Sequence, residues 1–342
     1  MTDQELRVGI IGVGLMGADH AERLAHRTSG ARLVAVSDPD TARAGGLAGR
    51  FDGVRAVTDP LALVGDGEVD AVLIASPGFV HEEQVLACLE AGKPVLCEKP
   101  LTMDGASSLR LVRAEREGGR ALVQLGFMRR FDPEYARLKA LLDSGRLGRL
   151  LLLHNIHRNK DVPNSFRSEM IVRDSLVHEV DVSRFLFGEE IAEVTVYSPT
   201  PTSAAAEGVI DPQVSVFRMA SGAVVTNEVF VRNQVGYEVR CEAVCERGSA
   251  IAGRPWGDLY TTAGSGDEGV WGGMVPTDFR DRFALAYDLE VQAWVDATRR
   301  GEVVGPTAWD GYAATVVCEA GMASLATGAP VAVDIVDQET LT

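Results

Sequence analysis

Lys99, Asp174 and His178 are the residues whose types and surroundings best suit acid–base chemistry. Lys99 follows the apolar run "VLCE" and precedes Pro100, which biases it away from helical geometry. Asp174 and His178 are four residues apart in "DSLVHEVDVSRFLF", where apolar residues recur at the spacing of an amphipathic helix. Residues at i and i+4 share a helix face, so a carboxylate and an imidazole are presented together. Histidine is the natural general base near neutral pH, and a nearby carboxylate can orient it and tune its pKa.

The same residues also have purely structural interpretations. Lys99 taken alone is equally consistent with the solvated end of a strand. Asp174 taken alone is equally consistent with a helix N-cap, and His178 with a partly buried helix residue. The residues themselves leave these alternatives open.

The N-terminal sequence predicts a dinucleotide-binding loop between a strand and a helix. Within "VGIIGVGLMGADHAERL" the loop consists of Gly12, Val13, Gly14, Leu15, Met16 and Gly17. In this motif the first glycine permits a tight turn, the second lets the backbone approach a pyrophosphate, and the third lets helix and strand pack closely. The helix N-terminus adds unpaired N–H donors.

Asp38 ends the second predicted strand, about 20 residues after the glycines, where a carboxylate receives the adenosine ribose hydroxyls. A carboxylate there repels a 2′-phosphate, and no arginine follows immediately, so the sequence favours NAD over NADP. The alternative is a turn residue before Pro39.

Ser76, Pro77 and Lys99 are expected at the carboxyl edge of the predicted sheet, after its fourth and fifth strands. Ligands of open α/β sheets bind outside that edge, so Ser76 and Pro77 are expected to flank the cofactor. A plain strand-to-helix turn is an equally good interpretation of these two residues. An enzyme that oxidises an alcohol with a nicotinamide needs a general base and a cation or donor beside the oxygen, and Lys99 ends its strand on the edge where such a group is needed.

The order of the predicted elements indicates an α/β protein with two domains. Strand-like and helix-like segments alternate in the N-terminal part, which is typical of a parallel sheet covered on both faces. Strand-like runs then follow one another before two long helical patterns, which indicates an open, mostly antiparallel sheet. We predict a doubly wound Rossmann domain over residues 1–125 and an α+β domain over residues 126–342, with a Gly-rich loop over residues 263–278.

Composition excludes several classes of function. The net charge of −16 argues against nucleic acid or an anionic membrane as partner. The chain shows neither a signal peptide nor an apolar run of membrane-spanning length, and its five cysteines lack a C-x-x-C pair, so we expect a reducing, cytoplasmic location. His154 and His157 are three apart in a predicted strand and therefore on opposite faces, so we expect no metal site.

The chain resembles the glucose–fructose oxidoreductase / inositol dehydrogenase / rhizopine catabolism family along essentially its whole length. The resemblance rests on "VGIIGVGLMG", "CEKPL", "LGFMRRFDPEY", "HNIHRN", "DSLVHEVDVSRFL" and "YEVRCE". The E-K-P and D-x-x-x-H patterns are widespread in that family, whereas "GFMRRFDP" and "HRN" are typical of its inositol branch. It implies NAD-dependent oxidation of myo-inositol to scyllo-inosose, and a homo-oligomer, with a tetramer favoured. The charged face of the strand over 238–246 departs from the apolar interface expected of such an oligomer.

The resemblance also implies roles for particular residues. Lys99, Asp174 and His178 would form a catalytic triad, in which His178 takes the hydroxyl proton, Lys99 hydrogen-bonds the reacting oxygen and Asp174 holds the pair. Further substrate contacts would come from Met128, His157, Asn159 and Tyr237. Glu98 and Arg129 would lie near the nicotinamide end of the cofactor.

Three alternatives compete with this interpretation. The first is a dehydrogenase of another cyclitol or of a pyranose such as glucose, because specificity among such stereoisomers depends on pocket geometry. The second is a non-catalytic dinucleotide sensor, which would have no need of Lys99, Asp174 and His178 together. The third is an NAD-dependent glycosidase, which would release sugar without accumulating NADH.

Overall fold

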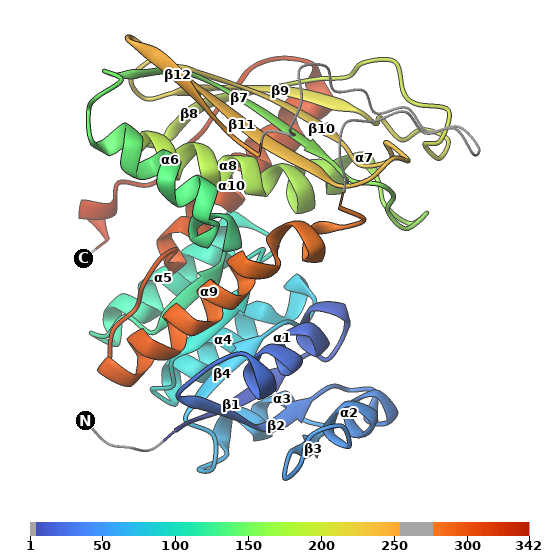
Figure 1. The fold of residues 1–342 in the computed structure, drawn as a ribbon, viewed down its shortest axis with the longest axis vertical. Helices are drawn as coiled ribbons and strands as arrows, with labels where there is room; N and C mark the ends of the chain where they lie inside the picture. Colours follow the sequence, from blue (N-terminus) through green and yellow to red (C-terminus); the bar gives the residue numbers. More distant parts are fainter. Residues whose placement is uncertain (1–4, 254–275, 342) are drawn as a thin grey trace. The chain divides into compact units, whose positions relative to one another are not determined.

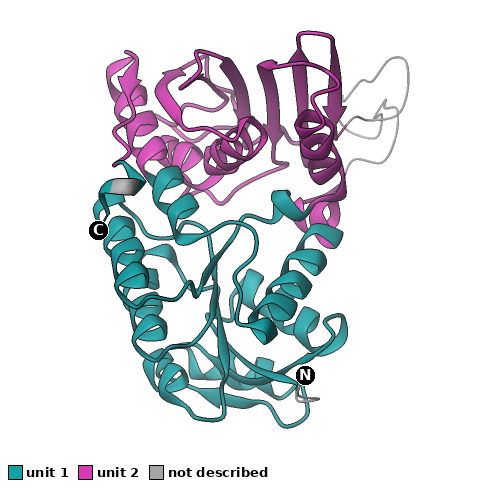
Figure 2. Ribbon diagram, turned by 90° about the vertical axis from the view of Figure 1, so that its left-hand side faces the viewer, with its two compact units in different colours: residues 1–131, 285–315, 337–342 teal, residues 132–284, 316–336 magenta. Residues whose placement is uncertain are grey.

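A computed structural model describes residues 5–253 and 276–341 of the chain (Figure 1). Most of the Gly-rich loop predicted over residues 263–278 lies outside them. The chain divides into two compact units, each described by itself below (Figure 2). The first unit comprises residues 1–131, 285–315 and 337–342, and the second comprises residues 132–284 and 316–336.

The first unit contains a six-stranded, wholly parallel sheet in the order β3-β2-β1-β4-β5-β6. Its strands are β1 (Leu6–Ile11), β2 (Ala31–Ser37), β3 (Arg55–Val57), β4 (Ala71–Ile74), β5 (Val95–Glu98) and β6 (Val123–Gly126). The strand order reverses between β1 and β4, and such a switch point opens a crevice at the carboxyl ends of the strands. The predicted doubly wound fold is therefore confirmed.

Helices cover both faces of this sheet. They are α1 (Leu15–His26), α2 (Thr41–Ala48), α3 (Pro60–Gly65), α4 (His81–Glu90), α5 (Gly105–Glu117) and the part of α9 (Phe279–Arg300) from residue 285 on. Trp294 of α9 and Leu24 of α1 are buried in one apolar cluster with Val8 and Ile10 of β1. A late segment of the chain therefore completes the core of the N-terminal sheet.

The second unit contains a seven-stranded mixed sheet in the order β12-β11-β7-β10-β9-β8-β13. Its strands are β7 (Leu150–Arg158), β8 (Ile191–Tyr197), β9 (Gln213–Met219), β10 (Val224–Phe230), β11 (Glu238–Cys245), β12 (Gly248–Ala252) and β13 (Val331–Ala332). Only the β7–β10 pair is parallel among the described strands of this second sheet, so the predicted open, mostly antiparallel sheet is confirmed. Its other elements are α6 (Pro133–Asp143), the short α7 (Ser168–Met170) and η3 (Ile171–Leu176), α8 (Val177–Phe187) and the latter part of α10 (Ala308–Thr327).

The two faces of this second sheet differ in burial. On the face that α8 covers in Figure 1, alternate residues such as His157, Cys241 and Cys245 are buried. His154 lies on the opposite face, where its Nδ1 is 2.7 Å from the hydroxyl of Thr226. The prediction that His154 and His157 point to opposite faces is confirmed.

The helical segment that carries Asp174 and His178 departs from the amphipathic helix predicted for it. Residues Ile171–Leu176 form a π-helical turn, and a regular α-helix begins at Val177. Asp174 lies inside this turn, so it is not the N-cap of α8. Residues on all sides of α8 are buried, Glu179 and Asp181 included, so the helix lacks a solvent-exposed polar face. π-Helical turns of this kind recur at functional sites.

No helix among residues 5–253 and 276–341 combines the length and apolarity that a membrane crossing requires.

Candidate active site

The glycine loop of the first unit has the geometry of a dinucleotide cradle. Gly12 has a φ of +84°, and a Cβ there would lie 2.4 Å from the backbone nitrogen of Ser76. A Cβ on Gly17 would lie 1.8 Å from the carbonyl oxygen of Gly12, whereas one on Gly14 would meet no atom within 4 Å. Gly14 is also the N-cap of α1 and makes no side-chain cap. The tight turn and close packing predicted for Gly12 and Gly17 are confirmed, and a pyrophosphate fits the open helix end beside Gly14.

Asp38 is held against this loop. The residue is 5% exposed, and its carboxylate accepts hydrogen bonds from the backbone N–H of Val13 at 3.0 Å and of Asp40 at 2.9 Å. Arg43 of α2 was not anticipated here, yet its Nη1 lies 3.6 Å from Asp38 Oδ2. The arginine that sequence reasoning did not find after Asp38 is therefore present one helical turn later.

His81 joins the turn after β4 to the turn after β5. Its Nδ1 is 2.8 Å from the carbonyl oxygen of Pro100, and its Nε2 is 2.8 Å from the carbonyl oxygen of Ser76. A neutral ring can donate to only one of these carbonyls, whereas a protonated ring donates to both. Cys97 Sγ lies 3.4 Å from Nδ1, and the Ser76 hydroxyl donates to Gln84 at 2.6 Å. His81 therefore fixes the turns that carry two predicted cofactor contacts and Lys99.

The environment of His81 predicts a pH dependence of stability. Burial lowers the pKa of His81 below its ordinary 6.5, against the opposing effect of the two carbonyl acceptors. As the pH falls below about 6.5 the unfolded chain takes up this proton first, so the free energy of unfolding decreases through that window. Denaturant titrations at several pH values should show that the free energy of unfolding decreases less with falling pH in His81→Gln than in the unmodified protein. Parallel curves for the two proteins would contradict this assignment.

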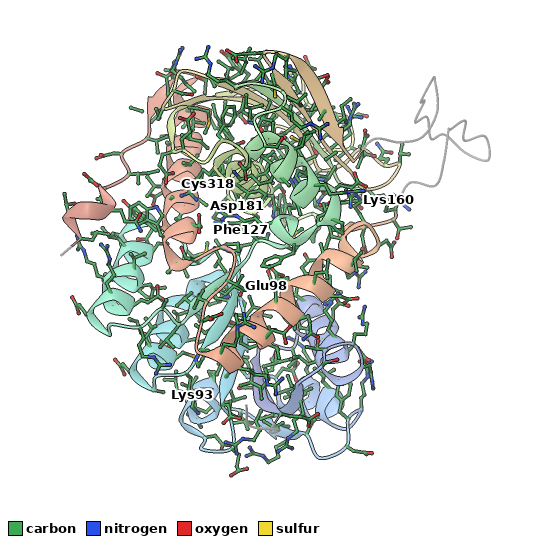
Figure 3. The ribbon with its side chains drawn as sticks, turned by 60° about the vertical axis from the view of Figure 1, so that its left-hand side comes forward. Lys93, Glu98, Phe127, Lys160, Asp181 and Cys318 are labelled. Atoms are coloured by element: carbon green, nitrogen blue, oxygen red, sulfur yellow. The ribbon has the colours of Figure 1, made fainter. Side chains whose placement is uncertain are left out.

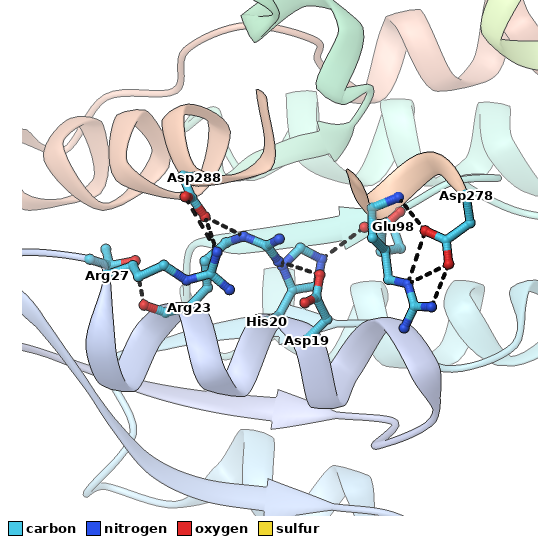
Figure 4. Close-up of polar contacts among 9 residues, drawn as sticks. Asp19, His20, Arg23, Arg27, Glu98, Asp278 and Asp288 are labelled. Carbon is cyan, nitrogen blue, oxygen red and sulfur yellow. Dashed lines mark hydrogen bonds and ion pairs between the residues drawn. The ribbon is translucent and has the colours of Figure 1, made fainter. Parts of the chain in front are cut away.

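Glu98 belongs to a buried polar cluster (Figure 4). Its Oε1 is 2.9 Å from Nε2 of His20 on α1, and Nη1 of Arg23 is 3.5 Å from Nδ1 of the same ring. A guanidinium only donates, so the ring proton of His20 is on Nε2 and is donated to Glu98. Arg23 is in turn paired with Asp288 of α9 at 2.7 Å. Glu98 is thus held as an acceptor, and its Oε2 also accepts from the backbone N–H of Lys99 at 3.3 Å.

Lys99 lies at the carboxyl end of β5, the edge at which the first unit also carries Gly12 and Ser76. Lys93 precedes the opposite end of the same strand, as Figure 3 shows for Lys93 and Glu98. Met128 and Arg129 follow β6 in a 3₁₀ turn, Met128–Phe131, and both are buried. All the predicted cofactor residues therefore belong to the first unit, at or near the carboxyl ends of its strands.

Asp174 has a fixed orientation in the second unit. Its two carboxylate oxygens accept from Nε and Nη2 of the neighbouring Arg173, each at 2.9 Å. This bidentate contact raises the pKa of the Arg173 guanidinium. Arg173 therefore stands beside the predicted catalytic carboxylate, a partner that the sequence pattern did not suggest.

His178, His157 and Tyr237 form a cluster on the buried side of the second sheet. The rings of His157 and His178 are 6.1 Å apart between centroids, and those of His157 and Tyr237 are 5.6 Å apart. The Tyr237 ring also packs edge-on against Phe279 and Phe283. Polar groups with these mixed donor and acceptor abilities suit a ligand with several hydroxyls.

Asn159 follows β7 directly, two residues after His157. Its backbone N–H donates to the carbonyl of Phe230 at 2.9 Å, which fixes the residue beside β10. Its buried Oδ1 accepts no hydrogen bond from any residue within 5–253 and 276–341. A buried polar atom of this kind requires an explanation, and contact with a ligand hydroxyl supplies one.

The structure thus gathers the predicted residues into two groups, one in each unit. Besides Arg43 and Arg173, three contributors were missed, namely His20, His81 and Glu179. All three are buried, but charged and polar residues stand beside each of them in the sequence, so helical spacing does not single them out. The burial of such a residue requires a polar partner that the local sequence does not name.

Comparison with known proteins gives matches over both units. Residues 6–127 match the oxidoreductase family with an NAD-binding Rossmann fold, and residues 135–251 match the GFO/IDH/MocA C-terminal domain. The chain is 54% identical over 342 residues to inositol 2-dehydrogenase 1 of Mycolicibacterium vanbaalenii, with 98% of each chain covered.

Two solved structures are also similar. One is myo-inositol dehydrogenase from Lactobacillus casei in complex with NAD(H) and myo-inositol, with a TM-score of 0.91, 32% identity and 99% of each chain covered. The other is scyllo-inositol dehydrogenase from the same organism with NAD(H) and scyllo-inositol, with a TM-score of 0.85, 25% identity, and 96% of this chain and 99% of that one covered.

Proposed function

Because the chain belongs to the GFO/IDH/MocA family of NAD-binding oxidoreductases, we propose that it oxidises myo-inositol at C2 to scyllo-inosose. The observation that carries the proposal is the cluster of His178, His157 and Tyr237, which offers a base and several hydroxyl-binding groups in one buried place. The similarity to dehydrogenases of inositol supports the same substrate class.

The chemistry assigned to each residue follows from its type and position. NAD, when bound at the glycine loop, supplies the acceptor for the hydride that leaves the alcohol carbon. His178 takes the hydroxyl proton as general base, and the ammonium of Lys99 hydrogen-bonds the oxygen as negative charge develops on it. Asp174 orients this pair and contacts ring hydroxyls. Met128, His157, Asn159 and Tyr237 complete the substrate contacts, and Glu98 and Arg129 lie at the nicotinamide end.

A second candidate is oxidation of another cyclitol or of a pyranose. The similarity to a dehydrogenase of scyllo-inositol favours this alternative, since the two cyclitols differ only in the orientation of one hydroxyl. Discrimination between such stereoisomers depends on hydrogen bonds to particular hydroxyls.

A substrate panel tests the proposal. The purified protein is supplied with NAD and each of myo-inositol, scyllo-inositol, a methylated inositol and glucose, and the absorbance of NADH is followed. We expect the highest kcat/KM for myo-inositol. Preference for scyllo-inositol or glucose would establish the second candidate, binding of NAD without turnover would indicate a sensor, and sugar release without NADH would indicate a glycosidase.

The contacts of Asp38 predict the cofactor preference. Its carboxylate would repel a 2′-phosphate, while Arg43 at 3.6 Å would attract one. We expect a higher kcat/KM with NAD than with NADP, and we expect Asp38→Ser to raise the NADP:NAD ratio roughly 10- to 100-fold, as for loss of one charge contact. The double variant Asp38→Ser/Arg43→Ala is the control, and it should lose most of that gain. A higher kcat/KM of the unmodified protein with NADP would contradict the assignment.

We also propose a homo-oligomer, with a tetramer favoured, that assembles through the open face of the second sheet. The charges predicted on this face are largely paired, since Arg158 contacts Glu228 at 2.6 Å and Glu238 at 2.9 Å. Half-buried apolar residues accompany them on the same face, among them Leu152, Ile156, Val214, Val216, Val224 and Phe230. A face with paired charges and apolar residues can be buried against another subunit more easily than the charged residues of its sequence suggest.

This assembly predicts that Val216→Asp lowers the oligomeric state, because an unpaired carboxylate would be buried at the interface. Light scattering after size exclusion measures the mass of the particle. Leu61→Asp, a matched change of a half-exposed leucine on α3, should leave the mass unchanged. An unmodified protein that elutes as a monomer would refute the proposal.

We propose a cytoplasmic location, with no nucleic acid or membrane as partner. All five cysteines are free thiols and are buried, which suits a reducing compartment. Cell fractionation tests this location.

A further inference from the structure

A buried carboxylate, Glu179 of α8, lies directly behind His157 of β7. Its Oε2 is 3.1 Å from His157 Nδ1, and the two side chains are 0% and 3% exposed. Burial of a carboxylate is strongly unfavourable unless donors satisfy it, so the contact with His157 stabilises Glu179 in its buried position. Ser183 fixes the helix at this point, because its hydroxyl donates to the carbonyl oxygen of Glu179 at 2.6 Å.

The contact determines where His157 carries its proton. In its ionised form the carboxylate of Glu179 only accepts hydrogen bonds, so the 3.1 Å contact then places a proton on Nδ1. The neutral ring then presents its lone pair at Nε2. Glu179 therefore makes Nε2 the acceptor end of His157.

Nε2 faces the proposed substrate groups. The hydroxyl of Tyr237 lies 3.4 Å from it, which is longer than an optimal hydrogen bond. A ligand hydroxyl that approaches more closely can replace this long contact. The His178 ring is 6.1 Å away, so the acceptor belongs to the cluster in which the cyclitol would be oxidised.

We propose that Glu179 is a positioning residue that fixes the Nδ1–H tautomer of His157, so that Nε2 accepts a hydrogen bond from one hydroxyl of the bound cyclitol. This inference rests on the proposed function for the identity of the ligand. It adds a specificity rule: the hydroxyl that faces His157 must donate a proton, so an O-methyl group at that position is rejected.

The tautomer can be measured directly in the full-length, unmodified protein. ¹⁵N NMR of histidine side chains distinguishes a protonated Nδ1 from a protonated Nε2, and the His157 signals are assigned by their loss in His157→Gln or by contacts to Tyr237. We expect a proton on Nδ1 and none on Nε2. A proton on Nε2, in the other neutral tautomer or in the imidazolium, overturns the proposal. This readout does not depend on the folding of any Glu179 variant.

The specificity rule is tested with Glu179→Gln, because a glutamine amide can donate to Nδ1 and release the tautomer. We expect kcat/KM for the preferred cyclitol to fall roughly 10- to 100-fold, as for a buried hydroxyl left without its acceptor, mainly through a higher KM. The Kd for NADH should not change. Glu207→Gln, an exposed glutamate of the same unit, is the matched control and should behave like the unmodified protein.

Methylated cyclitols separate positioning from a merely structural role. The unmodified protein should reject the O-methyl group at one ring position, and Glu179→Gln should reject it less. An unchanged pattern of rejection would overturn the proposal. If no cyclitol is oxidised at all, the proposed function fails, and the NMR measurement still decides whether Glu179 sets the tautomer of His157.

Discussion

Replacement of Lys99 by methionine is expected to lower kcat by about 10²–10³-fold, the effect of removing one donor that stabilises oxyanion charge. Lys99 directly follows β5 on the edge that carries the glycine loop, and Glu98 beside it is fixed by His20. Methionine keeps the length and apolar stem of the side chain but cannot donate to the reacting oxygen. Steady-state kinetics at saturating NAD and cyclitol measures the loss, and NADH fluorescence should show a nearly unchanged Kd.

Lys93 provides the matched control for this variant. It precedes the opposite end of β5, and its Nζ donates to the carbonyl oxygen of Asp66 at 2.6 Å. Lys93→Met should therefore reduce stability without reducing kcat per folded molecule. Retention of turnover in Lys99→Met, or an equal loss in Lys93→Met, would remove Lys99 from the mechanism.

The features that were predictable are those in which one residue type is required by local backbone geometry. Gly12 needs a positive φ, and Gly17 has no room for a Cβ, so the spacing of these glycines in the sequence already indicates the turn. The alternation of buried and half-exposed residues along β11 likewise follows from strand geometry alone. The doubly wound sheet follows from the same local rules, because alternating strands and helices leave few other arrangements.

The features that were not predictable depend on contacts between distant segments. His20 meets Glu98 across 78 positions of the chain, and Arg23 meets Asp288 across 265. Trp294 reaches the core of the first sheet only because α9 returns to it after strands β7 to β12 of the second sheet. Helical spacing indicated a helix near Asp174 but could not indicate its π-helical turn, which is a local departure from the regular helix.

Contacts that spacing did not indicate, both local and distant, change how the candidate site is understood. Spacing alone suggested a pair, Asp174 and His178, on one helix face. The structure adds Arg173 to the carboxylate and adds His157, with Glu179 behind it, to the imidazole. Each proposed reacting group therefore has a neighbour that limits its orientation, which is what a site for stereospecific oxidation requires.

Replacement of His178 by glutamine is expected to lower kcat by about 10²–10⁴-fold, the usual contribution of a general base. The ring of His178 is buried beside His157, so no solvent base replaces it readily. In His178→Gln, removal of the hydroxyl proton limits the reaction. A cyclitol deuterated at the oxidised carbon should then show a primary isotope effect on kcat only if hydride and proton leave in the same step. His26→Gln, at an exposed histidine of α1, is the control and should retain full activity. Turnover of His178→Gln at the rate of this control would exclude His178 as the base.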